Sequence, residues 1–200
     1  MKVLIFDTET GGLKPRVHSV MSAGWLTGDL DSGEIFETFE ALHKMKSLSD
    51  YKVSPGAVEI HGITPEKAFA EGISTEEIQD AFSDFHTRYT VSHLGGHNIP
   101  FDVETMSFQI FGFKETEEFR SNFGYRMIDS LSYTRLLSGL DDVKSGQTLK
   151  QACKALDIDM SDYTGKTFHG ALFDSVAAFR IMHRFRRAFA KPDAMKLLLP

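Results

Sequence analysis

The fold of this 200-residue chain is decided by residues 2–12, Lys2-Val3-Leu4-Ile5-Phe6-Asp7-Thr8-Glu9-Thr10-Gly11-Gly12. The apolar run at its start is typical of a buried strand, and the two glycines end that strand. Side chains two apart on a strand point to the same face, about 7 Å apart along the chain. We therefore expect Asp7 and Glu9 to project together from the carboxyl end of a central strand, where the sites of α/β sheets gather. Taken alone, the motif also fits a merely acidic strand end, since Asp102-Val103-Glu104 repeats its spacing.

A second motif, His97-Asn98-Ile99-Pro100-Phe101-Asp102, follows a short apolar run. Asn98 is a suitable N-cap and Pro100 suits the first helical turn. This pattern predicts Asp102 near the start of a helix.

A third motif, His169-Gly170-Ala171-Leu172-Phe173-Asp174, precedes an apolar pattern of helical period that runs to about residue 190. Five residues correspond to about 140° on a helix, so His169 and Asp174 do not share a helical face. We expect His169 in the loop before this helix and Asp174 within its first two turns.

Carboxylates gathered in one place repel one another unless hard cations lie between them, and oxygen-rich clusters favour magnesium or manganese. Two such ions about 3.5–4 Å apart promote in-line attack of water on a phosphodiester. A neighbouring histidine can accept the proton of the water near neutral pH. The three motifs together predict a metal-dependent nuclease.

At these motifs the chain resembles the DEDDh 3′–5′ exonucleases. The resemblance also takes in His61-Gly62-Ile63-Thr64, a loop that many members carry, and it spans residues 1 to about 190. A member of this family releases nucleoside 5′-monophosphates from a nucleic acid 3′ end with two ions, Mg2+ or Mn2+.

The resemblance implies a role for each matched residue. Four carboxylates would hold the ions, and His169 would be the general base. The histidine assigns the subgroup, since the sister group has a tyrosine where this chain has Gly170. The four metal ligands would be Asp7, Glu9, Asp102 and Asp174.

The resemblance also implies substrate contacts. The Thr10 backbone would bind the terminal 3′-hydroxyl, and Leu13 would lie against the terminal base. His61 and Asn98 are weaker candidates for substrate binding. For His61 and for Asp129 a structural role is favoured.

The expected fold is α/β: a ribonuclease-H-like mixed five-stranded sheet, with an antiparallel hairpin and helices on both faces. Residues 17–28 and 34–41 are typical of the hairpin, and Ser74-Thr75-Glu76-Glu77 is a capping box before a helix. Residues 91–95 and 126–129 fit two further short strands. We expect one exonuclease domain over residues 1–200, acting without a docking tail.

Composition limits the setting. No apolar stretch approaches the roughly 20 residues of a membrane span, and no signal peptide precedes the first strand. The single cysteine, Cys153, lies on a helical apolar stripe and predicts a buried thiol. A cytoplasmic location without membrane contact is expected.

The net charge of −6 is unusual for a protein that binds long stretches of nucleic acid. Ions at the site and a short terminal substrate would reduce this objection. A basic stripe falls on one helix face, where a solvated surface is slightly favoured over a substrate track. Its members are Arg180, Arg184, Arg187 and Lys191.

Hydrolysis of single-stranded or frayed DNA 3′ ends is the favoured function. An exoribonuclease of the same fold stays open, because the catalytic set does not distinguish the sugars. An endonuclease is disfavoured by the spacing of His169 and Asp174. A non-catalytic binding module is disfavoured by the intact set of five residues. The sequence identifies no polymerase or repair partner.

Overall fold

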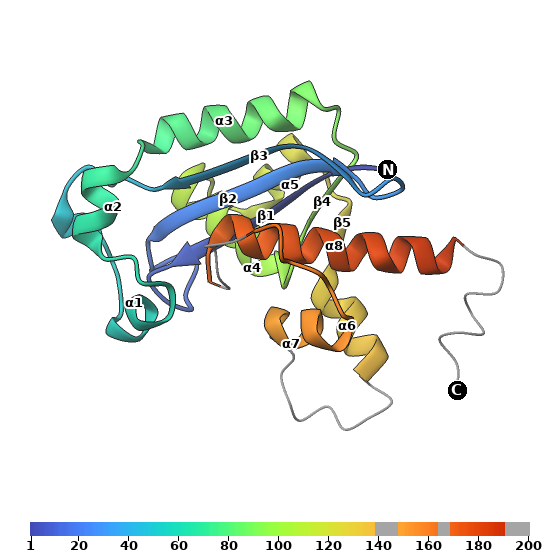
Figure 1. Ribbon diagram of the computed structural model, residues 1–200. Coiled ribbons are helices and arrows are strands. Elements are labelled where there is room, and N and C mark those ends of the chain that lie inside the picture. The colour runs from blue at the N-terminus through green and yellow to red at the C-terminus, as the bar shows by residue number, and fades with distance from the viewer. Residues whose placement is uncertain (139–147, 164–168, 191–200) are drawn as a thin grey trace.

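The computed structural model describes residues 1–138, 148–163 and 169–190. Five strands form one mixed sheet in the order β3-β2-β1-β4-β5 (Figure 1). β1 pairs antiparallel with β2 and parallel with β4, so it is the central strand. The strands are β1 (Lys2–Thr10), β2 (Val20–Asp29), β3 (Glu34–Leu42), β4 (His93–Gly96) and β5 (Met127–Asp129).

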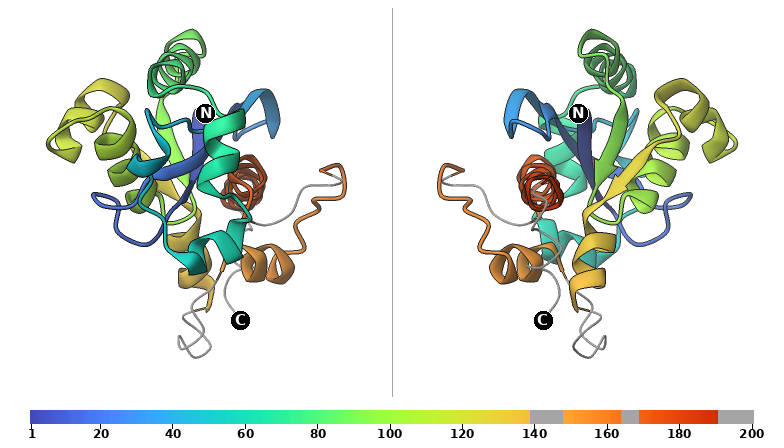
Figure 2. Two further views of the ribbon diagram at one scale, coloured as in Figure 1. Left: turned by 90° about the vertical axis from the view of Figure 1, so that its left-hand side faces the viewer. Right: turned by 90° about the vertical axis from the view of Figure 1, so that its right-hand side faces the viewer.

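Helices cover both faces of this sheet, with α8 on one side and α3, α4 and α5 on the other (Figure 2). A π-helical turn, η2, continues α4 without a break. The helices are η1 (Leu48–Asp50), α1 (Pro55–His61), α2 (Pro65–Glu71), α3 (Thr75–Arg88), α4 (Ile99–Thr105), η2 (Met106–Ile110), α5 (Thr116–Phe123), α6 (Ser130–Ser138), α7 (Leu149–Ala155) and α8 (Ala171–Phe189).

Alternation along β1 decides which residues reach the site. Val3 and Ile5 pack under α8, whereas Leu4 and Phe6 pack in the aromatic core beneath α3 and α4. Successive side chains of a strand point to opposite faces. The odd-numbered acids at the end of β1 therefore lie on the α8 face.

The predicted fold class is confirmed, with small shifts in element bounds. The first strand continues through the acidic motif and ends at Thr10, directly before the two glycines, and the Ser74 capping box opens α3. The phenylalanines contribute largely to the core, where Phe82 is fully buried among other rings.

The prediction for Asn98 is confirmed in position but not in its side-chain contact. Asn98 is the N-cap residue of α4 and Pro100 lies in the first turn, but the Asn98 side chain makes no capping hydrogen bond. Its backbone has φ of 66°, in the left-handed region that asparagine tolerates. The Asn98 N–H instead donates to the Asp129 carboxylate at 2.8 Å, so a segment far along the chain fixes this turn.

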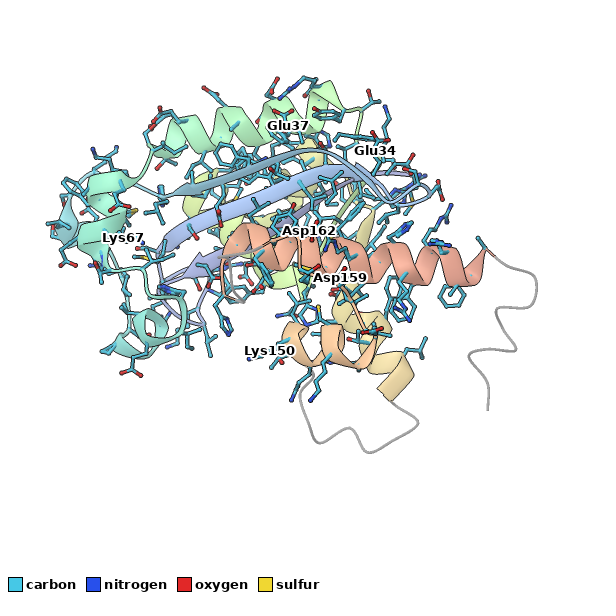
Figure 3. The ribbon with its side chains drawn as sticks, viewed as in Figure 1. Glu34, Glu37, Lys67, Lys150, Asp159 and Asp162 are labelled. Atoms are coloured by element: carbon cyan, nitrogen blue, oxygen red, sulfur yellow. The ribbon has the colours of Figure 1, made fainter. Side chains whose placement is uncertain are left out.

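The basic stripe on α8 makes contacts within the chain. Arg180 forms an ion pair with Asp162, which lies beside the helix (Figure 3), and Arg184 donates to the Asp157 carbonyl. These contacts favour the non-substrate interpretation; Lys191 lies outside the described residues. Cys153 is buried in α7, and burial raises the pKa of its thiol to about 11. Within the described ranges, no helix is long and apolar enough to cross a membrane.

Candidate active site

Three predicted metal ligands meet at the carboxyl end of β1. One carboxylate oxygen from each of Asp7, Glu9 and Asp174 lies within 4.8 Å of the other two. Glu9 and Asp174 are buried, and Asp7 is half-buried. The strand supplies two of these acids on one face, and the first turn of α8 supplies the third.

The start of α8 comes close to the sheet because β2 carries a glycine there. Gly24 is paired with Asp7 in the β1–β2 ladder. A Cβ on Gly24 would lie 2.3 Å from the backbone nitrogen of Leu172, so any side chain would push the helix away. The Ser175 hydroxyl donates to the Gly24 carbonyl at 2.9 Å and fixes this approach.

The clustered carboxyl groups are poorly suited to carry their charges unaided. Burial, followed by repulsion from Asp102 and Asp174, raises the pKa of Asp7 well above its usual value. Burial and the nearby acids raise the pKa of Glu9 to about 8, and burial raises that of Asp174 to about 7. At neutral pH the cluster therefore needs protons or cations.

The residues present fit divalent ions. The buried Asp174 Oδ1 has no hydrogen-bond partner among the described residues, although unpaired buried oxygens are costly. Its other oxygen accepts the His169 backbone N–H at 3.2 Å, so the carboxylate is held with Oδ1 left for a ligand. The donors are all oxygen, which suits a hard cation.

The fourth predicted ligand, Asp102, is placed differently. It comes from α4 on the opposite face of the sheet and lies outside the group of three, although its charge acts on Asp7. Asp102 Oδ1 accepts the Thr8 backbone N–H at 2.9 Å and the Thr8 hydroxyl at 2.7 Å. Burial still raises its pKa to about 7 against the lowering effect of these bonds.

The predicted general base, His169, is exposed in the loop before α8. Its φ of 70° is unusual for a residue with a side chain, and such strain is typical of functional sites. His169 lines a cleft of about 440 Å³, the His169 cleft, together with Ser22, Glu40 and Lys67.

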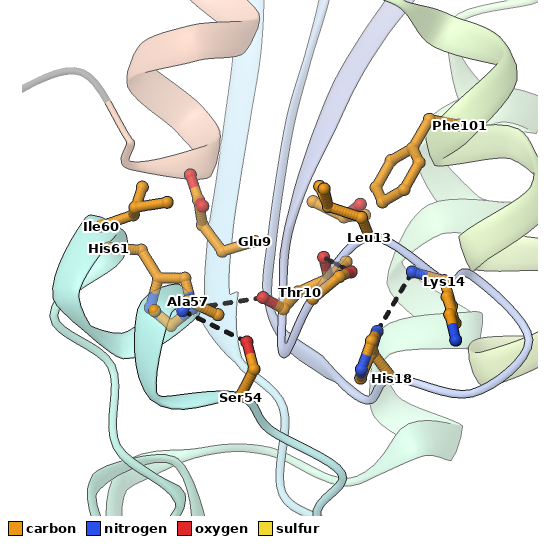
Figure 4. Close-up of a pocket in the computed structure, with 13 residues that line it drawn as sticks. Glu9, Thr10, Leu13, Lys14, His18, Ser54, Ala57, Ile60, His61 and Phe101 are labelled. Atoms are coloured by element: carbon orange, nitrogen blue, oxygen red, sulfur yellow. Dashed lines mark hydrogen bonds between the residues drawn. The ribbon is translucent and has the colours of Figure 1, made fainter.

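A second cleft, of about 510 Å³, opens on the other side of His61 and also borders the acidic cluster through Glu9. We call it the Leu13 cleft. Figure 4 shows Ile60 and His61 of α1 on one wall and Leu13 on the other. The Leu13 side chain is 89% exposed, so its apolar surface is free to meet a ligand. The structure thus brings Thr10, Leu13 and His61 together around one cleft.

His61 has a defined tautomer in this wall. Its Nδ1 accepts the Ile63 N–H at 3.0 Å, so the ring proton is on Nε2 and is donated to the Thr10 carbonyl at 3.2 Å. Burial, together with the nearby His169, lowers the pKa of His61, which keeps the ring neutral. Both bonds are to backbone atoms, as the structural role predicted for His61 requires.

Asn98 is not among the described residues that line either cleft. Its partner Asp129 accepts N–H groups from Asn98 and Leu131 and the Ser132 hydroxyl. Asp129 therefore joins the start of α6 to the turn before α4. The structural role predicted for this carboxylate fits these contacts.

Three residues that shape the site were missed from the sequence. They are Thr8, which holds Asp102, and Gly24 and Ser175, which set the approach of α8. Thr8 lies inside the first motif, and a glycine within an apolar strand signals a close backbone approach. Ser175, directly after Asp174, offers no local signal.

The fold is an α/β domain, and its acids come from the carboxyl end of the central strand and from the starts of two helices. This arrangement is typical of the class of metal-dependent hydrolases. Comparison with family models gives the family: the RNase T exonuclease model matches residues 4–182. The chain belongs to this exonuclease family, and the resemblance to its DEDDh members is confirmed. Comparison with curated proteins by sequence found no match.

Solved structures share this fold. The zinc-bound Escherichia coli exonuclease I complex with single-stranded DNA is 22% identical, with a TM-score of 0.73 over 98% of this chain and 42% of that one. Exonuclease I of Methylocaldum szegediense is 23% identical, with a TM-score of 0.71 over 94% and 43%. The E. coli complex with a dT13 oligonucleotide is 22% identical, with a TM-score of 0.71 over 100% and 46%. The chain thus spans less than half the length of these proteins.

Proposed function

We propose that this chain is a metal-dependent 3′–5′ exonuclease that releases nucleoside 5′-monophosphates from single-stranded or frayed DNA ends. The observation that carries the proposal is the group of three carboxylates, Asp7, Glu9 and Asp174, of which Glu9 lines the Leu13 cleft. DNA is favoured over RNA because the structural neighbours include exonuclease I bound to single-stranded DNA.

Two ions, Mg2+ or Mn2+, would be held by Asp7, Glu9, Asp102 and Asp174. When bound, they would supply Lewis-acid stabilisation of the charge that develops on the phosphate. The oxygen-only donor set supports a hard cation. The unpaired Oδ1 of Asp174 supports binding at this position in particular.

The remaining groups bind and orient the substrate and move a proton. The Leu13 cleft would take the terminal nucleoside, with Leu13 against the base and the Thr10 backbone at the 3′-hydroxyl. His169 would accept the proton of the attacking water from the His169 cleft. Exposure of the imidazole supports this role, because a base must exchange its proton with solvent in every cycle.

Digestion of single-stranded DNA, double-stranded DNA and RNA of one sequence, with and without chelator, tests the proposal. We expect mononucleotides from the 3′ end of single-stranded DNA, no products in chelator, and recovery with Mg2+ or Mn2+. A 3′ block should stop digestion, whereas a 5′ block should not. Preferred digestion of RNA, internal cuts, or no products would each contradict it.

A further inference from the structure

The loop of residues 11–19, here called the Leu13 loop, has apolar side chains that pack against little of the protein. Leu13 is 89% exposed and Val17 is 54% exposed. A backbone bond from the Gly11 N–H to the Ser19 carbonyl, at 2.8 Å, closes the base of the loop. Its tip needs an anchor if Leu13 is to keep one position.

That anchor comes from α4 and its continuation η2. Phe101 of α4 also lines the Leu13 cleft. The Gln109 side-chain amide donates to the Pro15 carbonyl at 2.9 Å. Arg16 bonds to Glu104 at 3.0 Å, and its guanidinium lies 4.1 Å from the centre of the Phe108 ring. Three helix residues thus meet two adjacent residues at the tip.

A π-turn makes this alignment of helix residues available. The Phe111 N–H bonds to the Met106 carbonyl at 2.9 Å, which is the i→i+5 pattern of η2. In a regular α-helix Glu104 and Gln109 would lie about 140° apart, whereas the wider turn brings both to the Leu13 loop. Such turns occur frequently at functional sites. Glu104, which repeats the acidic spacing of the first motif, acquires a structural function here.

The three contacts differ in how much they stabilise the loop conformation. Arg16 and Glu104 have side chains that are 58% and 37% exposed, and exposed ion pairs contribute little. The Gln109 bond is partly buried and reaches a backbone carbonyl, so it acts on the loop conformation directly. Gln109 is therefore the main anchor.

We propose that Gln109 is a positioning residue that holds the Leu13 loop for the terminal nucleoside, an inference that rests on the proposed exonuclease function. Gln109 touches no reacting atom. It fixes the Pro15 carbonyl, and thereby the placement of Leu13 and Lys14, which line the cleft.

Replacement of Gln109 by methionine tests this role, because the side chain keeps its length and neutrality but loses the donor. We expect KM for single-stranded DNA to rise about 3- to 10-fold, the usual worth of one hydrogen bond. The turnover number should stay within about twofold, since the loop binds ground state and transition state alike. Hydrogen exchange at the Val17 and His18 amides, both bonded to the Lys14 carbonyl, should become faster.

Gln79→Met is the matched control, because the Gln79 amide donates to the Ile110 carbonyl of the same π-turn. An unchanged KM in Gln109→Met, or an equal rise in both variants, would overturn the positioning role. Faster exchange without a change in KM would overturn it as well. Failure of the proposed function is distinguishable, because the wild-type protein would then release no mononucleotides.

Discussion

The starts of α4 and α8, which bring acids to the carboxyl end of β1, are alike in sequence and different in structure. Asp174 in α8 leaves a buried oxygen without a partner among the described residues, and its neighbours are acids. Asp102 in α4 gives one oxygen to two donors from Thr8. The acid in the first turn of α8 thus keeps a buried oxygen without a partner among the described residues, whereas the acid in α4 is bonded to the central strand.

The largest effect is expected from the α8 side of this comparison. Asp174→Asn keeps the shape of the side chain but removes the charge that a divalent ion requires. Turnover should fall on the order of 10⁴-fold, because ions at such sites supply several kcal/mol of stabilisation. Single-turnover digestion with Mn2+ measures the loss. Asp80→Asn, at an exposed acid on α3, is the control. Activity near wild type in Asp174→Asn would refute the metal site.

His169 provides the second test, because its backbone bonds to Asp174 and the residue also lines the His169 cleft. His169→Ala should lower turnover about 10²–10⁴-fold, the usual contribution of a general base. His169→Gln should not restore it, since an amide cannot accept the proton. A general base acts only when it is unprotonated, so the wild-type rate should increase from acid to neutral pH. A His169→Ala variant that retains the wild-type rate and pH profile would show that His169 is a polar loop residue without a catalytic role.

Gly24 tests whether α8 must lie as close to the sheet as it does. In Gly24→Ala the new Cβ would lie 2.3 Å from Leu172 N and 2.6 Å from the Ala171 carbonyl carbon, so the start of α8 must shift. Misplacement of about 1 Å can cost 10²-fold in rate, and we expect a loss of that order. A titration with Mn2+ should show weaker binding. Unchanged rate and metal affinity would mean that the approach of α8 is not required.

The sequence predicted the parts of the site that depend on local rules. Strand alternation put Asp7 and Glu9 on one face, and the start of α8 at Ala171 put Asp174 in its first turn. What could not be predicted are contacts between distant segments. The Thr8 bonds to Asp102 join residues 94 positions apart, and the Asn98 turn is held by a backbone bond to Asp129 and not by a side-chain capping bond. The single domain over residues 1–200 and the cytoplasmic location stay predictions.

The dependence of stability on pH sharpens the comparison in the absence of metal. Burial and nearby acids raise the pKa of Glu9 from 4.5 to about 8, and burial raises that of Asp174 from 3.8 to about 7. The folded protein therefore binds more protons than the unfolded chain between these values, and its free energy of unfolding falls as the pH rises from 5 to 8. Urea denaturation in chelator measures this decline. Mg2+ should reduce it, and Asp174→Asn should make it shallower. A free energy of unfolding that increases over this range would contradict the raised pKa values.

The smallest expected effect is a difference in the free energy of unfolding between variants of Asp102 and of Asp174. Asp102→Ala leaves the N–H and hydroxyl of Thr8 without their acceptor in a buried place, which should cost about 1–3 kcal/mol of unfolding free energy. Asp174→Ala leaves only the His169 N–H, in an exposed loop residue, without its acceptor. Both substitutions remove a charge that repels Asp7, so the donors left without an acceptor decide the difference between them. In chelator at pH 7.5, Asp174→Ala should therefore be as stable as the wild-type protein or more so, whereas Asp102→Ala should be less stable. The sign of the difference is the test, because loss of packing alone would destabilise both variants. Equal destabilisation would mean that the Thr8 bonds do not distinguish the two helix starts, and that the unpaired oxygen of Asp174 has no energetic cost for a cation to relieve.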